Sequence, residues 1–375
     1  MNLDNFSSFK SIDPQNMLGE IDSLPEQVQR AWNLGLSQPF SLTDRLSPSA
    51  SIRQVVISGM GGSAIGADLL ASYLAPVCKI PVFVHRDYGL PVWARGSETL
   101  VIASSHSGNT EETLDSFDAA LKNGCRLLAI STGGELAKRA TQKGIPLWIF
   151  EHKGQPRAAV GFSFGLLLAA FSRLGLIAPS EKITTACPGA QAREIVTTVE
   201  AMKKQQENLR AEVAVAQNPA KRMAGQLVGR WVNVFGSGLL APVARRWKTQ
   251  INEIAKAGAG FESLPETDHN TLAGLSNPKD VLSRTFGIFL RAPSEATNSI
   301  HPRNRLRADL TRQAFMLEGL NTDFYDAQGD TPLAHMWTAL HFGDYLAYYL
   351  AMAYSVDPTP VEALEKFKAD MKAAK

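Results

Sequence analysis

The sequence contains few cysteines, and none of them lies near another. Cys78, Cys125 and Cys187 are far apart along the chain and form no CxxC motif. A disulfide-stabilised scaffold and a cysteine-ligated zinc site both need more thiols, at closer spacing. We therefore exclude both classes of protein, and we expect this chain to work in the reducing cytoplasm without a metal.

Long apolar runs are also missing. A helix that crosses a bilayer needs roughly 20 consecutive apolar residues, and stretches such as 164–171 are far shorter. The N-terminus, MNLDNFSSFKSIDPQNML, has acidic and polar residues where a secretory signal needs a basic start and an apolar run. We expect neither export nor a membrane partner.

The chain has no excess of charge of one sign. It carries 38 basic and 36 acidic residues, which leaves a formal net charge of +2. Domains that bind nucleic acid usually have a marked basic excess, so we expect no nucleic-acid partner. Any preference for an anionic ligand must then come from a local arrangement of residues.

Strand and helix patterns alternate from Arg53 onward. The β-branched runs QVVIS, IPVFVHR, TLVIASS, RLLAIST and PLWIF are separated by segments with helical spacing, such as TEETLDSFDAALKNG. Nearly continuous apolar strands that alternate with helices predict a parallel sheet covered on both faces, a doubly wound α/β fold. We predict this first domain over residues 45–180, after a helical leader over residues 1–44.

The second half of the chain resembles the first. WVNVFGSGLLAPVARRWKTQI follows the same order as VVISGMGGSAIGADLLASYL, with an apolar strand, a glycine-rich turn and a helix. A chain of 375 residues is also longer than one compact core usually holds. We predict an internal duplication, with a connecting helix over 181–225 and a second domain with C-terminal helices over 226–375.

The first glycine-rich turn, residues 59–64, joins a predicted strand to a predicted helix. Backbone N–H groups at such a helix start attract anions, and glycines such as Gly62 let the ligand approach closely. Ser63 adds a hydroxyl donor. Taken alone, the turn also fits a structural tight turn or a dinucleotide-binding loop.

A second loop, SHSGNTEET over residues 105–113, follows the strand TLVIAS. Ser105, Ser107 and Thr110 offer three hydroxyl groups near one helix start, where they can donate to phosphate oxygens. The alternative is an ordinary helix N-cap, with two glutamates in the first turn that favour the helix dipole. The residues of this loop alone do not decide between the two.

Together, the two loops resemble the sugar isomerase (SIS) family, in which a glycine-rich turn and an S-x-S-G-N-T-x-E-T loop bind the phosphate of a sugar. The resemblance implies that Gly62, Ser63, Ser105, Ser107 and Thr110 hold a phosphate. In the second half, the corresponding turn reads GSGL and has leucine in place of the hydroxyl. We expect that half to keep the fold without the phosphate site.

Further motifs resemble the bifunctional phosphoglucose/phosphomannose isomerase family over nearly the whole chain. They include KTQINE at 248–253, LPETDHN at 264–270, QPRAAVG and HPRNRLRADLT. The resemblance implies Glu253 as the base that moves a proton between C1 and C2, His269 as the group that opens the sugar ring, and Arg157 as a stabiliser of negative charge. Among the other histidines, His301 is the most serious competitor of His269. These side chains suit an enediolate mechanism without a cofactor.

The family also uses a lysine near the C-terminus, for which this chain has two candidates in VEALEKFKADM. Lys368 lies four residues after Leu364, at the edge of an apolar stripe, and we favour it over Lys366. The alternative is that both lysines are solvated. The chain departs from its relatives at His106, where tyrosine is common, and after Glu253, where it has Ile-Ala and relatives commonly have asparagine.

The resemblance implies an enzyme of carbohydrate metabolism, active in glycolysis and gluconeogenesis, whose substrate is a sugar phosphate. Glucose 6-phosphate, together with mannose 6-phosphate, would be interconverted with fructose 6-phosphate. The resemblance also implies a homodimer with shared active sites, in which His269 reaches the partner's pocket. The alternative is a sugar-phosphate-binding regulator that keeps the serine-rich pocket without catalysis.

Overall fold

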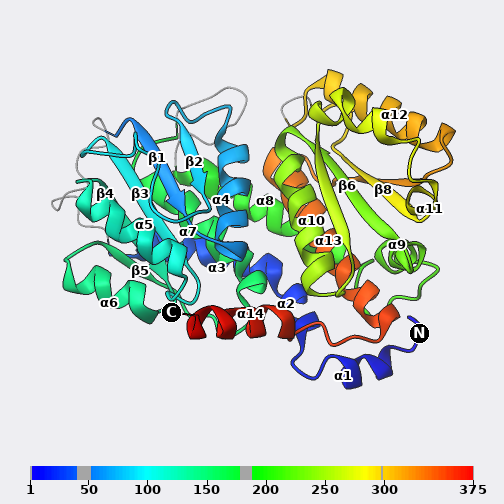
Figure 1. The fold of residues 1–375 in the computed structure, drawn as a ribbon, viewed down its shortest axis with the longest axis horizontal. Helices are drawn as coiled ribbons and strands as arrows, with labels where there is room; N and C mark the ends of the chain where they lie inside the picture. The colour runs from blue at the N-terminus through cyan, green and yellow to red at the C-terminus, as the bar shows by residue number, and fades with distance from the viewer. Residues whose placement is uncertain (1, 40–51, 178–187, 297–298, 375) are drawn as a thin grey trace.

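The computed structural model describes residues 2–39, 52–177, 188–296 and 299–374. Within them, the chain forms two parallel β-sheets, each packed with helices, and the sheets lie on opposite sides of a central group of helices (Figure 1). The N-terminal helices and the last helix run along one edge of the molecule.

The first sheet has five parallel strands in the order β2-β1-β3-β4-β5. The strands are β1 (Gln54–Ser58), β2 (Val82–His85), β3 (Thr99–Ser105), β4 (Arg126–Ser131) and β5 (Leu147–Ile149). Val55 and Ile57 point into one apolar core, whereas Val56 points into another. Because both faces are covered, the prediction of a doubly wound sheet is confirmed. Strand order reverses between β1 and β3, where ligands of such folds bind.

Helices cover the two faces of this sheet unequally. The larger core is formed with α3 (Leu24–Ser37), α4 (Gly61–Leu74) and α7 (Val160–Arg173), and the smaller with α5 (Glu111–Lys122) and α6 (Gly134–Gln142). The leader also contains η1 (Phe6–Ser8), α1 (Phe9–Ile12) and α2 (Met17–Asp22), and a short 3-10 helix, η3 (Pro156–Ala159), precedes α7.

The second sheet repeats the first. Its four parallel strands lie in the order β7-β6-β8-β9, which matches the order β2-β1-β3-β4. The strands are β6 (Trp231–Ser237), β7 (Ala259–Leu264), β8 (Thr285–Arg291) and β9 (Asn321–Asp326). Gly61 and Gly238 follow the first strand of each sheet with the same φ of +50°. The repeated order and the repeated turn agree with the predicted duplication.

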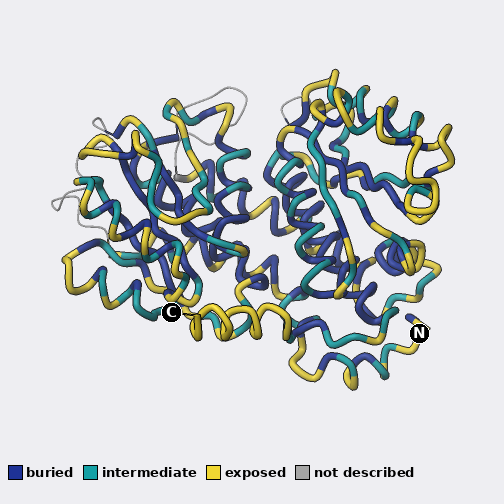
Figure 2. The backbone as a smooth tube through the Cα atoms, in the orientation of Figure 1, coloured by how far each residue is buried: buried dark blue, intermediate teal, exposed yellow. Residues whose placement is uncertain are grey.

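The helices of the second half are α8 (Pro188–Gln206), α9 (Pro219–Leu227), α10 (Ala241–Glu253), α11 (Lys279–Leu282), α12 (Pro302–Leu317), α13 (Pro332–Tyr354) and α14 (Glu362–Ala373), with the 3-10 turns η4 (Gly238–Leu240), η5 (Glu266–His269) and η6 (Thr271–Gly274). The buried helix α13 packs against α8, α9 and α10, and α14 is exposed along its length (Figure 2). None of the described helices is both long and apolar enough to cross a membrane.

The connecting helix predicted over 181–225 is in fact two helices. α8 ends at Gln206, and the chain then turns until Asn218, whose side chain caps α9 by accepting hydrogen bonds from two backbone N–H groups. Pro219 starts α9 because a proline fits the first turn of a helix but not its interior. The predicted domain boundaries at 44/45 and 180/181 lie outside the described residues, and the division into domains stays a prediction.

The two halves meet through α4 and α10. The Ser72 hydroxyl donates to the Gly238 carbonyl at 3.2 Å, and Arg245 Nη1 lies 2.7 Å from Asp68 Oδ2. Within the second half, the buried Arg246 pairs with Asp344 of α13 at 2.8 Å. These contacts hold α10 against the first half, so its C-terminal end is positioned relative to the first sheet.

Candidate functional site

The first glycine-rich turn lies at the carboxyl end of β1. Gly61 has φ of +50°, a conformation that glycine adopts without strain. Gly62 packs so closely that an added Cβ would lie 2.4 Å from the Pro156 carbonyl oxygen. Ser63 is buried in the first turn of α4. The free N–H groups of this helix start make the turn suitable for an anion.

The serine-rich loop lies beside this turn, at the carboxyl end of β3. The Ser105 hydroxyl accepts from the Gly108 N–H at 3.1 Å and lies 3.0 Å from the Thr110 hydroxyl. The exposed Ser107 accepts from a backbone N–H at 3.2 Å. The two loops touch directly, because the backbone N–H of His106 donates to Ser63 Oγ at 3.3 Å. The structure thus brings the five predicted phosphate-binding residues together at the carboxyl ends of β1 and β3, where the strand order reverses.

Arg157 enters this region from η3, next to Gly62. Its side chain is buried, and Nη2 donates to the carbonyls of Pro358 (2.9 Å) and Thr359. Burial lowers the pKa of Arg157, while the negative charge of Glu253 raises it. Arg157 Nη1 lies 3.7 Å from Glu253 Oε2, so the predicted base and the predicted charge stabiliser are neighbours in one chain.

Glu253 is the last residue of α10, and this position brings Lys256 to the site as well. Lys256 has φ of +52°, and its amine donates to the carbonyl of Glu253 at 2.8 Å. Burial, with the nearby charge of Arg157, lowers the pKa of Lys256 to about 8. The sequence reasoning missed this lysine. Its place three residues after Glu253 was the one available signal.

His269 and Lys368 lie apart from these groups. His269 ends η5 and is exposed, at the carboxyl edge of the second sheet, where β7 ends. Helix α10 begins at that carboxyl edge, and Glu253 lies at its other end. Since α10 has 13 residues, it is about 20 Å long. Lys368 is on the exposed face of α14, as is Lys366, and neither has an ion pair within the described chain.

His106, within the serine-rich loop, is linked to two side chains that the sequence did not indicate, His152 and Glu20. His106 Nε2 is 2.9 Å from Nδ1 of His152, which follows β5. His152 Nε2 is in turn 3.2 Å from Glu20 Oε2 of α2. These residues come from three segments far apart in sequence, and no local motif links them.

The grouped residues can perform a definite kind of chemistry. The two loops offer hydroxyls and helix N–H groups to a phosphate, while Glu253 offers a carboxylate and Arg157 a fixed positive charge. A carboxylate can carry a proton between adjacent carbons, and a guanidinium can stabilise the negative charge that develops on oxygen. Among the residues described, no group of three or more His, Cys, Asp or Glu side chains is arranged to hold a metal ion.

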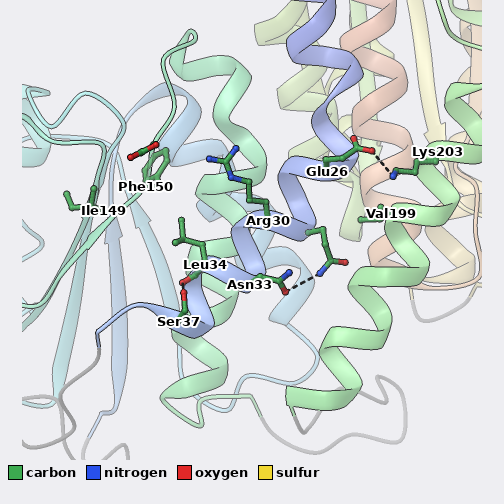
Figure 3. Close-up of a pocket in the computed structure, with 11 residues that line it drawn as sticks. Glu26, Arg30, Asn33, Leu34, Ser37, Ile149, Phe150, Val199 and Lys203 are labelled. Atoms are coloured by element: carbon green, nitrogen blue, oxygen red, sulfur yellow. Dashed lines mark hydrogen bonds and ion pairs between the residues drawn. The ribbon is translucent and has the colours of Figure 1, made fainter.

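A groove lies away from these residues. It has a volume of about 720 Å³ and is lined by α3, α8 and the residues that follow β5 (Figure 3). Glu26 and Lys203 form an ion pair of 2.6 Å across it. None of the predicted site residues lines this groove.

The chain is similar to proteins of known name. It is 38% identical over 355 residues to a bifunctional phosphoglucose/phosphomannose isomerase of Caldicellulosiruptor bescii, a match that covers 94% of this chain and 98% of the relative. An enzyme of the same name from Aquifex aeolicus is 30% identical, over 90% of this chain and 96% of the relative. Residues 216–371 match the family of the bacterial phospho-glucose isomerase C-terminal SIS domain.

Solved structures agree on the fold. The crystal structure of tagatose-6-phosphate ketose/aldose isomerase from Escherichia coli superposes with a TM-score of 0.69 at 15% identity, over 91% of this chain and 94% of that one. A glucose-6-phosphate isomerase like protein from Thermus thermophilus superposes with a TM-score of 0.61 at 18% identity, over 98% of each chain. At these identities, the likeness establishes the architecture of two SIS-type sheets.

Proposed function

This chain belongs to the bifunctional phosphoglucose/phosphomannose isomerase family, and we propose that it interconverts glucose 6-phosphate and mannose 6-phosphate with fructose 6-phosphate. The observation that carries the proposal is the pairing of Glu253 with Arg157 at 3.7 Å, beside the two loops suited to a phosphate. Glucose and mannose 6-phosphate differ only at C2, and both lead to the same enediolate. One site of this kind therefore serves both sugars.

The reaction follows from the positions of these groups. The loop hydroxyls of Ser63 and Ser105 and the start of α4 hold the phosphate of the open-chain sugar. The Glu253 carboxylate takes the proton from C2 of the aldose and returns it to C1 of the ketose. The guanidinium of Arg157 stabilises the negative charge on the enediolate oxygens, and its burial strengthens that interaction. The steps need no redox cofactor, because a proton and not a hydride moves.

We further propose that the protein is a two-fold homodimer in which His269 acts at the site of the other chain. The support is the length of α10, since about 20 Å of helix lies between Glu253 and the sheet edge that carries His269. A closed two-fold pair would bring two such histidines to two equivalent sites. In the same dimer, Lys368 of the exposed α14 would approach a sugar, and ring opening would fall to His269.

The physiological setting is part of the proposal. Cys78 and Cys125 form no disulfide, which suits a reducing cytoplasm. There, the proposed reaction would link hexose phosphates in carbohydrate metabolism, in the direction of glycolysis or of gluconeogenesis.

The alternative is a regulator that binds a sugar phosphate without converting it. Such a protein needs the serine-rich pocket but has no use for a carboxylate held next to a buried arginine. The Arg157–Glu253 pair favours the enzyme.

A product assay tests the proposed reaction. Purified protein is incubated with fructose 6-phosphate in the presence of a chelator, and glucose 6-phosphate and mannose 6-phosphate are measured separately. We expect both products. Tight binding of fructose 6-phosphate with neither product formed would favour the regulator.

Complementation tests the shared site. A Glu253→Gln chain and a His269→Ala chain are mixed under conditions that exchange subunits, and the activity of the mixture is compared with that of each variant alone. We expect activity to return, because some heterodimers would hold one site with both groups intact. A mixture no more active than its parts would contradict the sharing of His269.

A further inference from the structure

Glu20, His152 and His106 form a continuous hydrogen-bond chain that ends at the phosphate loop. Glu20 is on α2, His152 follows β5, and His106 lies between Ser105 and Ser107. The distances are 3.2 Å from Glu20 Oε2 to His152 Nε2 and 2.9 Å from His152 Nδ1 to His106 Nε2. The proposed reaction has no role for this hydrogen-bond chain. Its central member is well packed, since the side chain of His152 is only 7% exposed.

The carboxylate fixes the proton positions along the chain. Glu20 accepts from His152 Nε2–H, and this hydrogen bond lowers the pKa of Glu20. A neutral His152 then has a lone pair on Nδ1, which must accept from Nε2–H of His106. Burial, together with the proximity of His152, lowers the pKa of His106 to about 4. At neutral pH, His106 is therefore uncharged, and its Nδ1 carries a lone pair.

His106 belongs to the serine-rich loop, and its second ring nitrogen is Nδ1. This nitrogen makes no hydrogen bond to the described part of the chain, and it is not among the buried polar atoms without a partner, so solvent reaches it. Nδ1 is bonded to Cγ, on the side of the ring nearer the backbone, and the backbone N–H of His106 touches Ser63 Oγ. A phosphate held by Ser63 and Ser105 would lie within the reach of this nitrogen.

A lone pair at that position conflicts with a bound phosphate, because phosphate oxygens are acceptors. The conflict is removed if one proton from solvent binds His106 Nδ1 while the proton on His106 Nε2 passes to His152 Nδ1. His106 then stays neutral and donates to the phosphate, and His152 becomes an imidazolium next to the Glu20 carboxylate. One N–H bond breaks, two form, and the net change is one proton taken from solvent.

We propose that the Glu20–His152–His106 chain couples the binding of a sugar phosphate to the uptake of one proton. The inference rests on the phosphate site of the proposed function. The two phosphate loops, residues 59–63 and 105–113, contain no lysine or arginine, and the second contains two glutamates. The proton stored on His152 therefore supplies positive charge that the loops lack.

Glu151 and Lys153 flank His152 in the sequence, and both are exposed to solvent. Phe150 packs against the His106 ring, with 5.8 Å between the ring centroids, and Phe162 packs against the His152 ring at 5.9 Å. The Arg30 guanidinium lies over the Phe162 ring, 5.4 Å from its centroid. Glu20 is the acidic group in hydrogen-bond contact with the chain. Both the proton uptake and its stabilisation are therefore assigned to these three side chains.

Calorimetry measures the proton uptake directly. Fructose 6-phosphate is titrated into the full-length protein at pH 8 in two phosphate-free buffers with different ionisation enthalpies. At this pH, the ligand is already a dianion, since the second pKa of a phosphate ester is about 6, so any proton taken up binds to the protein. We expect an uptake between about half and one proton per site, and a Kd that rises up to about tenfold per pH unit above pH 8.

Variants identify the groups responsible. His106→Asn keeps a hydrogen-bond donor without a titrating ring, and Glu20→Gln keeps the shape of the carboxylate without its charge. We expect uptake near zero for His106→Asn and reduced uptake for Glu20→Gln. Glu26→Gln, on the surface of α3, is the matched control for Glu20→Gln and should keep the wild-type uptake.

The outcomes separate this inference from the proposed function. Binding without proton uptake, or an uptake unchanged in both His106→Asn and Glu20→Gln, would overturn the inference and leave the isomerase reaction intact. If the wild-type protein binds no fructose 6-phosphate, the proposed function and the inference both fall. Glu20→Gln is a mild change on a part-exposed side chain. It therefore still tests the role of the three hydrogen-bonded side chains if His106→Asn does not fold.

Discussion

The contact between Gly62 and Pro156 offers a sharp test of how the site is held together. In Gly62→Ala, the new Cβ would lie 2.4 Å from the Pro156 carbonyl oxygen, 3.0 Å from its carbonyl carbon and 3.4 Å from the Arg157 nitrogen. A carbon atom and a non-bonded heavy atom normally stay about 3.5 Å apart or more. The obstacle is backbone, which cannot rotate away as a flexible side chain can, so η3 must move by roughly 1 Å.

That movement displaces Arg157 from Glu253. A misplacement of about 1 Å in a catalytic group can cost roughly 100-fold in rate, and overpacking of this kind costs about 1 to 3 kcal/mol of stability. We expect kcat to fall about 100-fold in the isomerase assay, with a smaller change in KM, because Ser63 and Ser105 still hold the phosphate.

The matched control is Gly225→Ala in α9. An added Cβ there meets no atom within 4 Å, and alanine is a better helix former than glycine by about 1 kcal/mol. We expect this variant to keep wild-type activity and to unfold at the same or a higher temperature. A Gly62→Ala protein that is folded and has wild-type kcat would refute the argument that Gly62 sets the position of Arg157.

Three other predictions concern binding and stability. The double variant Ser105→Ala/Ser107→Ala should raise the KM for fructose 6-phosphate, since each lost phosphate hydrogen bond is worth roughly 1 to 3 kcal/mol, and an unchanged KM would place the phosphate elsewhere. Lys256→Gln should raise the unfolding midpoint at pH 7, because the folded chain lowers the pKa of Lys256 from 10.5 to about 8 and so disfavours its charge. This gain should shrink above pH 8 and vanish near pH 10.5; a gain independent of pH would contradict it. Asn218→Ala should cost about 0.5 to 2 kcal/mol in denaturant unfolding, through loss of the α9 cap, and a neutral result would show that the cap is dispensable.

The parts of the site that the sequence predicts are those carried by short motifs. The turn around Ser63 and the loop around Ser105 each follow a recognisable strand, and parallel strands bring such loops to one sheet edge. The doubly wound fold follows from the same alternation of strands and helices. Strand β7 is harder to recognise, because only the two ends of AGFESL are buried and the residues between them are partly exposed.

The parts that the sequence does not predict depend on contacts between distant segments. Glu20 and His152 are 132 residues apart, and no spacing rule joins them. Lys256 looks like an ordinary surface lysine, and only the fold buries it and brings Arg157 close, which together lower its pKa. The predicted connecting helix failed for a local reason that was visible in the sequence, namely Asn218-Pro219, a helix start inside the predicted span.

The central claim is that Glu253 carries the proton between C1 and C2, and single-turnover kinetics of Glu253→Gln tests it most directly. The variant removes the carboxylate with little change in volume, and Glu318→Gln, at the exposed end of α12, is the matched control. We expect Glu253→Gln to bind fructose 6-phosphate with nearly wild-type Kd while product formation falls by several orders of magnitude, and Glu318→Gln to match the wild type. A Glu253→Gln protein that forms glucose 6-phosphate at close to the wild-type rate would contradict the account.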